Sequence, residues 1–395
     1  MPNPPELYCL QMKATVKPML LKWARERASL TTDDLAQRLH VRPARVEDWE
    51  RTGQLTLKQL ENVARASYTP IGYLFLPEPP VEKLPIPDFR TLKSEELQQP
   101  SPNLLDVIHQ CQRRQNWYRE YLIANGGQPL AFLGKTKTSE PIERVAGQIR
   151  KVIGLDTSTR SRNRTWEETL AQMIEQVEAA GILVMRSGVV GNNPHRPLFV
   201  EEFRGFALYD EYAPLIFLNG VDTKAAQMFT LAHEVAHLWL GESGVSNLHA
   251  TFVSNIDVER FCNQVAAEVL VPLHEFRAAW QTGVEPLGEV RRLAGKFKVS
   301  TLVLLRRALD AQRINQDAFE RLYEAESEHL VDLAKGRTGG DFYLTQKSRL
   351  GTRFQQALIE SALEGRTLYR DAFQLLGISK VETFYELART LKFAV

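Results

Sequence analysis

The chain has 395 residues, which is enough for two or three domains. Its apolar content of 44% and charged content of 25% are ordinary for a globular protein, and a formal net charge of +1 gives no overall field that favours nucleic acid or membranes. The three scattered cysteines form no Cys-x-x-Cys pair, which favours a reduced compartment. No secretion leader and no run of 18 apolar residues is present, so we expect a cytoplasmic protein.

Residues 14–80 are predicted to form a domain of short helices. The segment Thr31-Thr-Asp-Asp-Leu-Ala-Gln-Arg-Leu-His-Val41 begins with helix-capping residues and has apolar residues at helical spacing. A second helix is predicted in Arg42-Pro-Ala-Arg-Val-Glu-Asp-Trp-Glu50, where Pro43 suits the first turn. The pair resembles the Xre type of helix-turn-helix, although Gly53 falls one residue later than in the pattern L-A-x-x-L-x-V-s-x-x-x-I-x-x-W-E-x-G.

The resemblance implies that the second helix enters the major groove of DNA. Its leading residues, Arg42, Ala44 and Arg45, are the candidate base-contacting residues. Residues 18–77 hold nine Lys/Arg and seven Asp/Glu, a net charge of only +2, and Glu47 and Asp48 on the same helix would repel phosphate. DNA binding and docking of a protein partner both stay open, as does a homodimer, because Xre-type readers usually bind paired half-sites.

Proline marks the region that follows. Seven of the 20 prolines lie within residues 77–103, so residues 81–103 are predicted to be a proline-rich linker. Residues 104–160 are expected to form a helical connector. The periodicity predicts helices at Leu104–Leu122, Glu140–Ile153 and Trp166–Ala180.

Residues 161–275 are predicted to form a core of strands and helices. Three short apolar runs between turn residues predict strands: Gly181–Met185, Gly205–Tyr209 and Pro214–Asn219. A long apolar helix follows them, so we expect a small mixed sheet packed against helices. The strand near 205–210 is a candidate edge strand, to which an extended peptide would add.

The motif H-E-x-x-H occupies His233–His237 within the predicted helix Ala225–Leu240. Imidazoles at positions i and i+4 of a helix face the same way and can share one metal ion. Zinc in such a site takes two histidines and a carboxylate, and it leaves a fourth position for water. Glu234, beside the first histidine, is placed to take a proton from that water.

Four side chains are candidates for the third ligand. Glu242 lies too close, on the end of the same helix, and His249 lies in an irregular stretch. Glu259 and Glu268 are about two and a half turns apart on the next predicted helix, so they point to opposite faces. Glu259 is favoured because Asn263 lies one turn further on the same face and provides an amide to orient the ligand. The alternative is that Glu259 and Asn263 form a solvated helix face.

These residues resemble the ImmA/IrrE family of bacterial zinc metallopeptidases over roughly residues 165–310. The matching segments are Phe229-Thr-Leu-Ala-His-Glu-Val-Ala-His-Leu and Glu259-x-x-x-Asn263-x-x-Ala-Ala-Glu-Val-Leu-Val-Pro272. Cys262 and Val265 replace the Ala and Phe of the family pattern, both apolar changes on a packing face. The resemblance implies Zn²⁺ as cofactor and limited, regulatory cleavage of a protein partner such as an Xre-type repressor, coupled to transcriptional control.

Two further questions concern the mechanism. Attack of water on a peptide carbonyl creates an oxyanion that needs a hydrogen-bond donor, and His249, Tyr209 and Tyr212 are the candidates. Some fused Xre–ImmA/IrrE proteins resemble antitoxins. The alternative function is therefore an antitoxin-like or DNA-binding regulator that binds a partner toxin, with a zinc site that is little used, silent or only structural. The intact Glu234 favours the enzyme.

The remaining residues are predicted to be helical. Within residues 276–336, Leu293-Ala-Gly-Lys-Phe-Lys-Val-Ser300 echoes Leu35-Ala-Gln-Arg-Leu-His-Val-Arg42 but lacks the Trp-Glu-x-x-Gly tail. We therefore expect a subdomain that braces the active site. Residues 341–395 are expected to form a small helical domain of unassigned role. The predicted fold class is α+β and mostly helical, with an N-terminal helix-turn-helix domain, a minimal zincin core and a helical C-terminal part.

Overall fold

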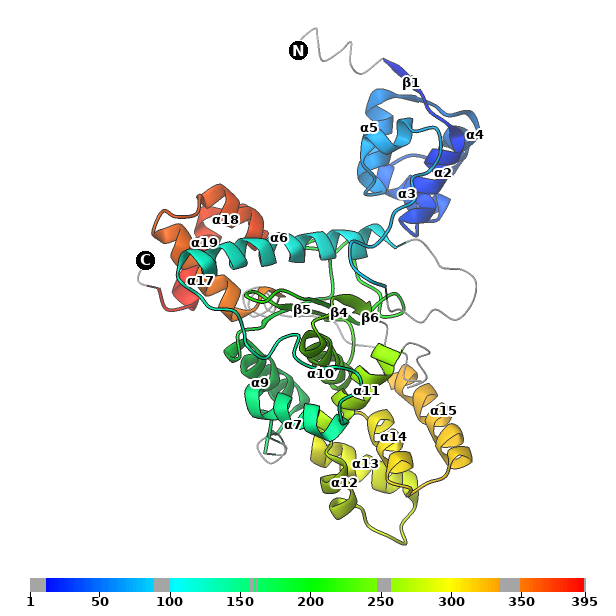
Figure 1. Cartoon of the computed structure of the whole chain (residues 1–395). Helices are drawn as coiled ribbons and strands as arrows, with labels where there is room; N and C mark the ends of the chain where they lie inside the picture. Colours follow the sequence, from blue (N-terminus) through cyan, green and yellow to red (C-terminus); the bar gives the residue numbers. More distant parts are fainter. Residues whose placement is uncertain are drawn as a thin grey trace. The chain divides into compact units, whose positions relative to one another are not determined.

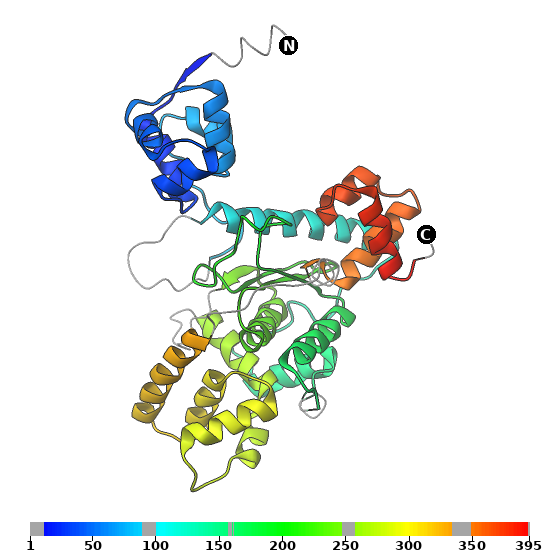
Figure 2. The same cartoon turned by 180° about the vertical axis from the view of Figure 1, so that it is seen from behind.

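The computed structural model describes residues 12–88, 100–156, 160, 162–246, 257–333 and 349–393. It has the predicted α+β class, mostly helical with a small mixed sheet (Figures 1 and 2). The described residues divide into two units, one of residues 12–85 with 100–108 and one of residues 86–88 with 109–393. Within these ranges, no helix is long and apolar enough to cross a membrane.

The N-terminal unit is a small helical bundle with a core of its own. Thr31 accepts a hydrogen bond from the Asp34 N–H in a capping box, and Pro43 opens the second helix of the predicted pair. Leu35 and Trp49 are buried in the shared core. The elements are β1 (Lys13–Thr15), α2 (Pro18–Arg27), α3 (Thr32–Leu39), α4 (Pro43–Thr52), β2 (Gln54–Thr56), α5 (Leu57–Ala66) and the 3-10 helix η1 (Ile71–Phe75).

Gly53 ends α4 and explains the departure from the helix-turn-helix pattern. Its φ of 66° lies in the left-handed region, which favours glycine. The Val16 N–H donates to the Gly53 carbonyl at 3.0 Å, and a Cβ on Gly53 would lie 2.0 Å from the Val16 carbonyl oxygen. The late glycine therefore closes a longer α4 and lets the β1–β2 pair approach it.

The sheet of the second unit has the order β3-β5-β4-β6. The three predicted strands are confirmed as β3 (Leu183–Ser187), β4 (Gly205–Leu208) and β5 (Leu215–Asn219). β3 runs parallel to β5, whereas β4 is antiparallel to β5 and to β6 (Gly244–Ser246). The prediction that the strand near 205–210 lies at the edge is wrong, because β6, which the sequence did not reveal, pairs with its outer side.

Helices cover both faces of this sheet. Both views show α6 (Pro102–Ala124) along one face, and α9 (Trp166–Ala179), α10 (Lys224–Leu240) and α11 (Asp257–Leu270) along the other (Figures 1 and 2). Gln115 of α6 donates to the carbonyl oxygens of Leu208 and Ala213, each at 2.9 Å. Burial from both sides explains why every residue of β4 and β5 is buried.

The C-terminal helices attach to this unit at two places. α12 (Leu273–Ala279), α13 (Pro286–Phe297), α14 (Thr301–Asp310) and α15 (Gln316–Leu333) follow α11. α17 (Thr352–Leu363), α18 (Tyr369–Leu376) and α19 (Val381–Thr390) pack at the end of α6 (Figure 1). Arg114 of α6 donates to the Leu375 carbonyl at 3.0 Å, and the Tyr121 hydroxyl donates to Glu360 at 2.8 Å. The C-terminal helices are therefore joined to α6 by specific polar contacts.

Candidate metal centre

Helix α10 carries the H-E-x-x-H motif through the centre of the second unit. It begins where Thr223 accepts a hydrogen bond from the Ala226 N–H at 3.2 Å, and it ends at Gly241, whose φ is 81°. Every residue from Gln227 to Trp239 is buried. A helix that is buried all round loses water on every face, so its polar side chains need partners within the protein.

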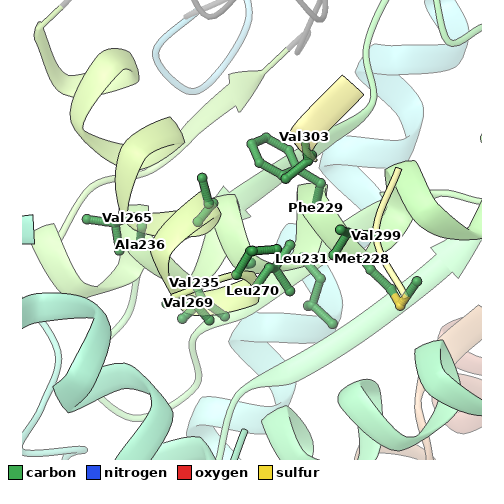
Figure 3. Close-up of a cluster of buried hydrophobic side chains, with 14 of the residues drawn as sticks. Met228, Phe229, Leu231, Val235, Ala236, Val265, Val269, Leu270, Val299 and Val303 are labelled. Atoms are coloured by element: carbon green, nitrogen blue, oxygen red, sulfur yellow. The ribbon is translucent and has the colours of Figure 1, made fainter. Parts of the chain in front are cut away.

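Apolar packing fixes α10 against α11. Leu231 and Val235 of α10 lie in one cluster with Val265 and Val269 of α11, and Val303 of α14 joins them (Figure 3). Close packing of this kind leaves little freedom for the two helices to shift. The polar side chains that α10 and α11 direct at each other are therefore held in place.

His233, His237 and Glu259 converge on one point between these helices. The two Nε2 atoms are 3.0 Å apart. Glu259 places one carboxylate oxygen 3.3 Å from Nε2 of His233 and the other 2.9 Å from Nε2 of His237. All three residues are buried and form the one group of potential metal ligands found among the described residues.

This donor set fits zinc. Ligand atoms bonded to a tetrahedral zinc ion at 2.0–2.1 Å lie about 3.3 Å from one another, close to the separations found here. Burial opposes ionisation of Glu259, but the charge of His233 and hydrogen bonds to both imidazoles hold its pKa low, at about 2. The carboxylate is thus ionised and ready to bind a cation.

The other ligand candidates do not join this group. Glu259 is 4% exposed and Asn263 is 7% exposed, so the interpretation as a solvated helix face is wrong. Glu268 points away, as predicted, and accepts a hydrogen bond from Arg307 at 2.9 Å. Glu242 follows α10 and is absent from the group, and His249 lies outside the described residues. The role of Asn263 in orienting Glu259 stays a prediction.

Glu234 is fully buried where β4 meets α10. A Cβ on Gly205, at the start of β4, would lie 3.3 Å from the Glu234 Oε1 and 2.5 Å from the Thr230 Cγ2. Only a residue without a side chain allows β4 to approach α10 this closely. Gly205 belongs to no motif in the sequence, but a glycine in a predicted strand is itself a sign of close backbone approach.

Cys262 is a second neighbour of the site, and its position in the sequence indicated only a packing role. Burial raises the pKa of its thiol well above the ordinary value, and the carboxylates of Glu259, Glu234 and Glu242 raise it further. The thiol is therefore neutral. The metal-ligand group of the described residues does not include it.

The proposed oxyanion donors lie at the far end of β4. The Tyr209 N–H donates to the Ser243 Oγ at 2.8 Å, and the phenol ring lies beside Gly134. The Tyr212 N–H donates to Asp210 at 2.9 Å in the turn that follows. Both tyrosines come after Leu208, the last residue of β4, whereas Gly205 and Glu234 meet at its first residue. Their part in catalysis stays a prediction.

The candidate DNA-contacting residues are all exposed on α4. Arg42, Ala44 and Arg45 face solvent at its first turn. Arg45 lies 3.4 Å from Asp48, and Arg51 lies 2.6 Å from the other oxygen of the same carboxylate. Two of the basic groups of α4 therefore share one acid, which reduces the positive field at this surface.

Comparison with known families finds two matching segments in the second unit. Residues 177–309 match the IrrE N-terminal-like domain of peptidase family M78, and residues 350–390 match a domain of unknown function, DUF8813. No curated protein matches the chain. The first match contains the His233–His237–Glu259 group, which is consistent with a metallopeptidase. It also reaches into α14, which the sequence assigned to a separate subdomain, while neither match extends to the N-terminal helices.

Proposed function

We propose that the second unit is a zinc-dependent endopeptidase. The observation that carries this proposal is the convergence of His233, His237 and Glu259 beside the buried Glu234. The match to a peptidase family over residues 177–309 supports it. A zinc site with a purely structural role usually has four protein ligands, whereas this group of three leaves a position for water.

Each residue has a distinct role in this mechanism. Zinc held by the three ligands would lower the pKa of water and polarise the scissile carbonyl. Glu234 receives the proton of the attacking water and passes it to the nitrogen of the leaving amine, as the new C–O bond forms and the C–N bond breaks. β4 approaches Glu234 at Gly205 and shields its carboxylate from solvent, since the group is fully buried.

We further propose that the substrate is a protein partner, such as an Xre-type repressor, which is cut at a limited number of sites. The support is the N-terminal helical unit, whose α3–α4 pair resembles the Xre pattern. Such a unit would recruit a repressor or an operator. Limited cleavage would then release transcriptional control.

The exposed face of α4 favours a second candidate, a DNA-binding or antitoxin-like regulator that binds a partner toxin and makes little use of the zinc site. Arg42, Ala44 and Arg45 are open to solvent and available to a partner. This candidate predicts binding that does not depend on Glu234.

One experiment separates the two candidates. We would capture partners from native cells on zinc-loaded wild-type protein and on Glu234→Gln, and record intact masses. The enzyme is supported if Glu234→Gln retains zinc and captures an intact partner, whereas the same partner captured on the wild type is shortened. Cleavage by Glu234→Gln at more than about one per cent of the wild-type rate would contradict it, since loss of a general base costs about 10²–10⁴. Glu242→Gln, the same chemical change just beyond α10, is the matched control.

A further inference from the structure

The outer edge of the catalytic sheet is covered by a segment from far upstream. The Val245 N–H of β6 donates to the Pro87 carbonyl at 3.0 Å, and Asp88 pairs with Val245 in a parallel bridge. We call Pro87–Asp88 the strap. β6 is the last strand of the described sheet, so the strap takes the place of one further strand.

The covered edge lies close to the candidate active site. β6 pairs directly with β4, with Ser246 opposite Gly205 and Val245 opposite Phe206. Gly205 is the residue that approaches the carboxylate of Glu234. Extended peptides are commonly recognised by adding a strand to an open sheet edge, and a peptide paired with β6 would run past this corner of the site.

Two prolines limit the pairing of the strap with β6. The Pro87 carbonyl accepts the backbone hydrogen bond from Val245. Pro85 and Pro87 have no N–H, so this stretch cannot form the regular ladder of a true strand. The prolines keep the segment extended before it binds. A peptide with free N–H groups would make more hydrogen bonds with the same edge.

The strap is also tethered. Glu82 belongs to the N-terminal unit, where its carboxylate accepts two hydrogen bonds from Arg27, the one from Nη2 at 2.7 Å. Only four residues separate Glu82 from Pro87, and an extended chain spans at most about 3.6 Å per residue. Because the strap and β6 belong to one chain, the strap meets the edge at a higher effective concentration than a separate peptide does.

We propose that the strap is a removable placeholder, and that an extended peptide substrate pairs with β6 only after the strap has left. The catalytic unit is therefore latent while the strap is in place. The part of this inference that concerns cleavage rests on the proposed peptidase function. The part that concerns peptide binding does not.

An engineered disulfide that holds the strap on β6 tests, in the full-length protein, whether peptide binding requires the strap to leave. In Asp88→Cys/Val245→Cys, paired strand positions would form a disulfide on oxidation, which a phosphine reductant opens. The probe is a fluorescein-labelled peptide, Lys-Leu-Val-Ile-Val-Asp-Phe-Arg, which copies residues 83–90 with Val in place of both prolines and so has free N–H groups at every position. We expect at least a tenfold higher affinity of the reduced than of the oxidised variant, measured by anisotropy. Equal affinities would overturn the proposal, and Asp88→Cys alone is the matched control.

A second variant covers the case in which the lock prevents folding. Ile86→Gly, just before the strap, keeps every backbone hydrogen-bonding group of the segment but makes the free segment more flexible, so ordering it on β6 is less favourable. We expect the labelled peptide to bind about two to five times more tightly to Ile86→Gly than to the wild type, a factor that corresponds to the usual effect of a glycine in an extended segment. Unchanged or weaker binding would contradict the placeholder role.

The cleavage part has its own readout. We would digest β-casein, an unfolded substrate, with the zinc-loaded double variant in both redox states. Cleavage that stops on oxidation and returns on reduction supports the inference. Equal cleavage in both states overturns it and leaves the peptidase in place. If neither state cleaves casein but peptide affinity still follows the disulfide, the binding part of the inference stands, and the enzymatic function is decided by cleavage of the captured partner with wild type and Glu234→Gln.

Discussion

The helix pairs α3–α4 and α13–α14 share one local pattern but occupy different environments. The segments are Leu35-Ala-Gln-Arg-Leu-His-Val41 and Leu293-Ala-Gly-Lys-Phe-Lys-Val299. Both turns begin with a left-handed residue of φ 54°, His40 in the first pair and Lys298 in the second. In both, the following Val N–H donates back to the Ala carbonyl, at 3.0 Å and at 3.4 Å. The local sequence therefore specifies the same turn twice.

The second helices of the two pairs differ in what surrounds them. α4 buries two residues, Val46 and Trp49, and exposes its first turn. α14 buries five residues, Val303, Leu304, Leu305, Arg307 and Ala308. α4 thus keeps an exposed face, whereas α14 is enclosed by α12, α13 and α15. A helix-turn-helix pattern indicates the geometry of the turn, and the residues that follow determine whether the second helix is free to bind.

The largest effect is expected at Arg307. Its guanidinium and the Glu268 carboxylate form a buried pair at 2.9 Å that joins α14 to α11. Burial raises the pKa of Glu268, which Arg307 partly counteracts. Arg307→Ala would leave a buried carboxylate without its cation and is expected to destabilise the protein by about 3–5 kcal/mol. The midpoint of urea unfolding, followed by tryptophan fluorescence, measures this loss.

Arg306→Ala is the control for this experiment. Arg306 pairs with Asp310 at 3.0 Å on a part of α14 that is about three-tenths exposed. Such a pair contributes about 0–1 kcal/mol. If Arg306→Ala and Arg307→Ala destabilise the protein equally, burial is not what distinguishes α14 from α4.

The next effect concerns α4. Arg42→Ala should leave the unfolding midpoint unchanged, because an exposed side chain away from special contacts shifts stability by less than about 0.5 kcal/mol. Arg45→Ala should cost at most about 1 kcal/mol, because its pair with Asp48 is exposed. If α4 reads DNA, each loss of a base contact costs about 1–3 kcal/mol of binding. The measurement is anisotropy with duplexes selected from a random-sequence pool by the wild type. Unchanged affinity in both variants would show that α4 serves another partner.

Most of the correct predictions follow from rules that relate residues close together in the sequence. Thr31 and Pro43 begin the helices for which their chemistry is suited, and the H-E-x-x-H spacing placed two imidazoles on one side of α10. The choice of Glu259 as the third ligand required a further step, in which the helical repeat placed Glu259 and Glu268 on opposite faces of one helix. That step succeeded because both residues lie on one unbroken helix.

Features that depend on distant parts of the chain could not be predicted in this way. Pro87 meets β6 only in the folded protein, and the prolines around it indicated a linker rather than an added strand. Gly205 approaches Glu234 because β4 and α10 pack against each other, a contact with no local pattern. The pairing of Arg307 with Glu268 is of the same kind. Periodicity identifies elements and their faces, whereas tertiary packing decides which faces meet.

A smaller effect tests the similarity of the two turns. A left-handed conformation costs a non-glycine residue about 1–2 kcal/mol, which glycine avoids. The greater flexibility of glycine in the unfolded chain offsets about 0.4–1 kcal/mol of this gain. His40→Gly is therefore expected to stabilise the protein by about 0.5–1 kcal/mol. Lys298→Gly should gain less, because its ammonium lies 5.9 Å from the centre of the Trp166 ring and this contact is lost. Thermal unfolding measures both variants, and destabilisation by His40→Gly would show that the turns differ.

The smallest effect concerns the acidic residues at the start of each first helix. The hydroxyl and backbone N–H of Thr31 lower the pKa of Asp34, and the backbone N–H groups of Leu287 and Gly288 lower the pKa of Glu285. A carboxyl group with a lowered pKa in the folded state stabilises the protein above its unfolded pKa of about 4, and this contribution is lost as the pH falls through the folded pKa. Asp34→Asn and Glu285→Gln should therefore lower the melting temperature slightly at pH 7 and leave it nearly unchanged at about pH 2. Because both groups are exposed, the two shifts should be similar. If only one of the two substitutions lowers the melting temperature, the starts of α3 and α13 differ, even though the turns that follow these two helices are alike.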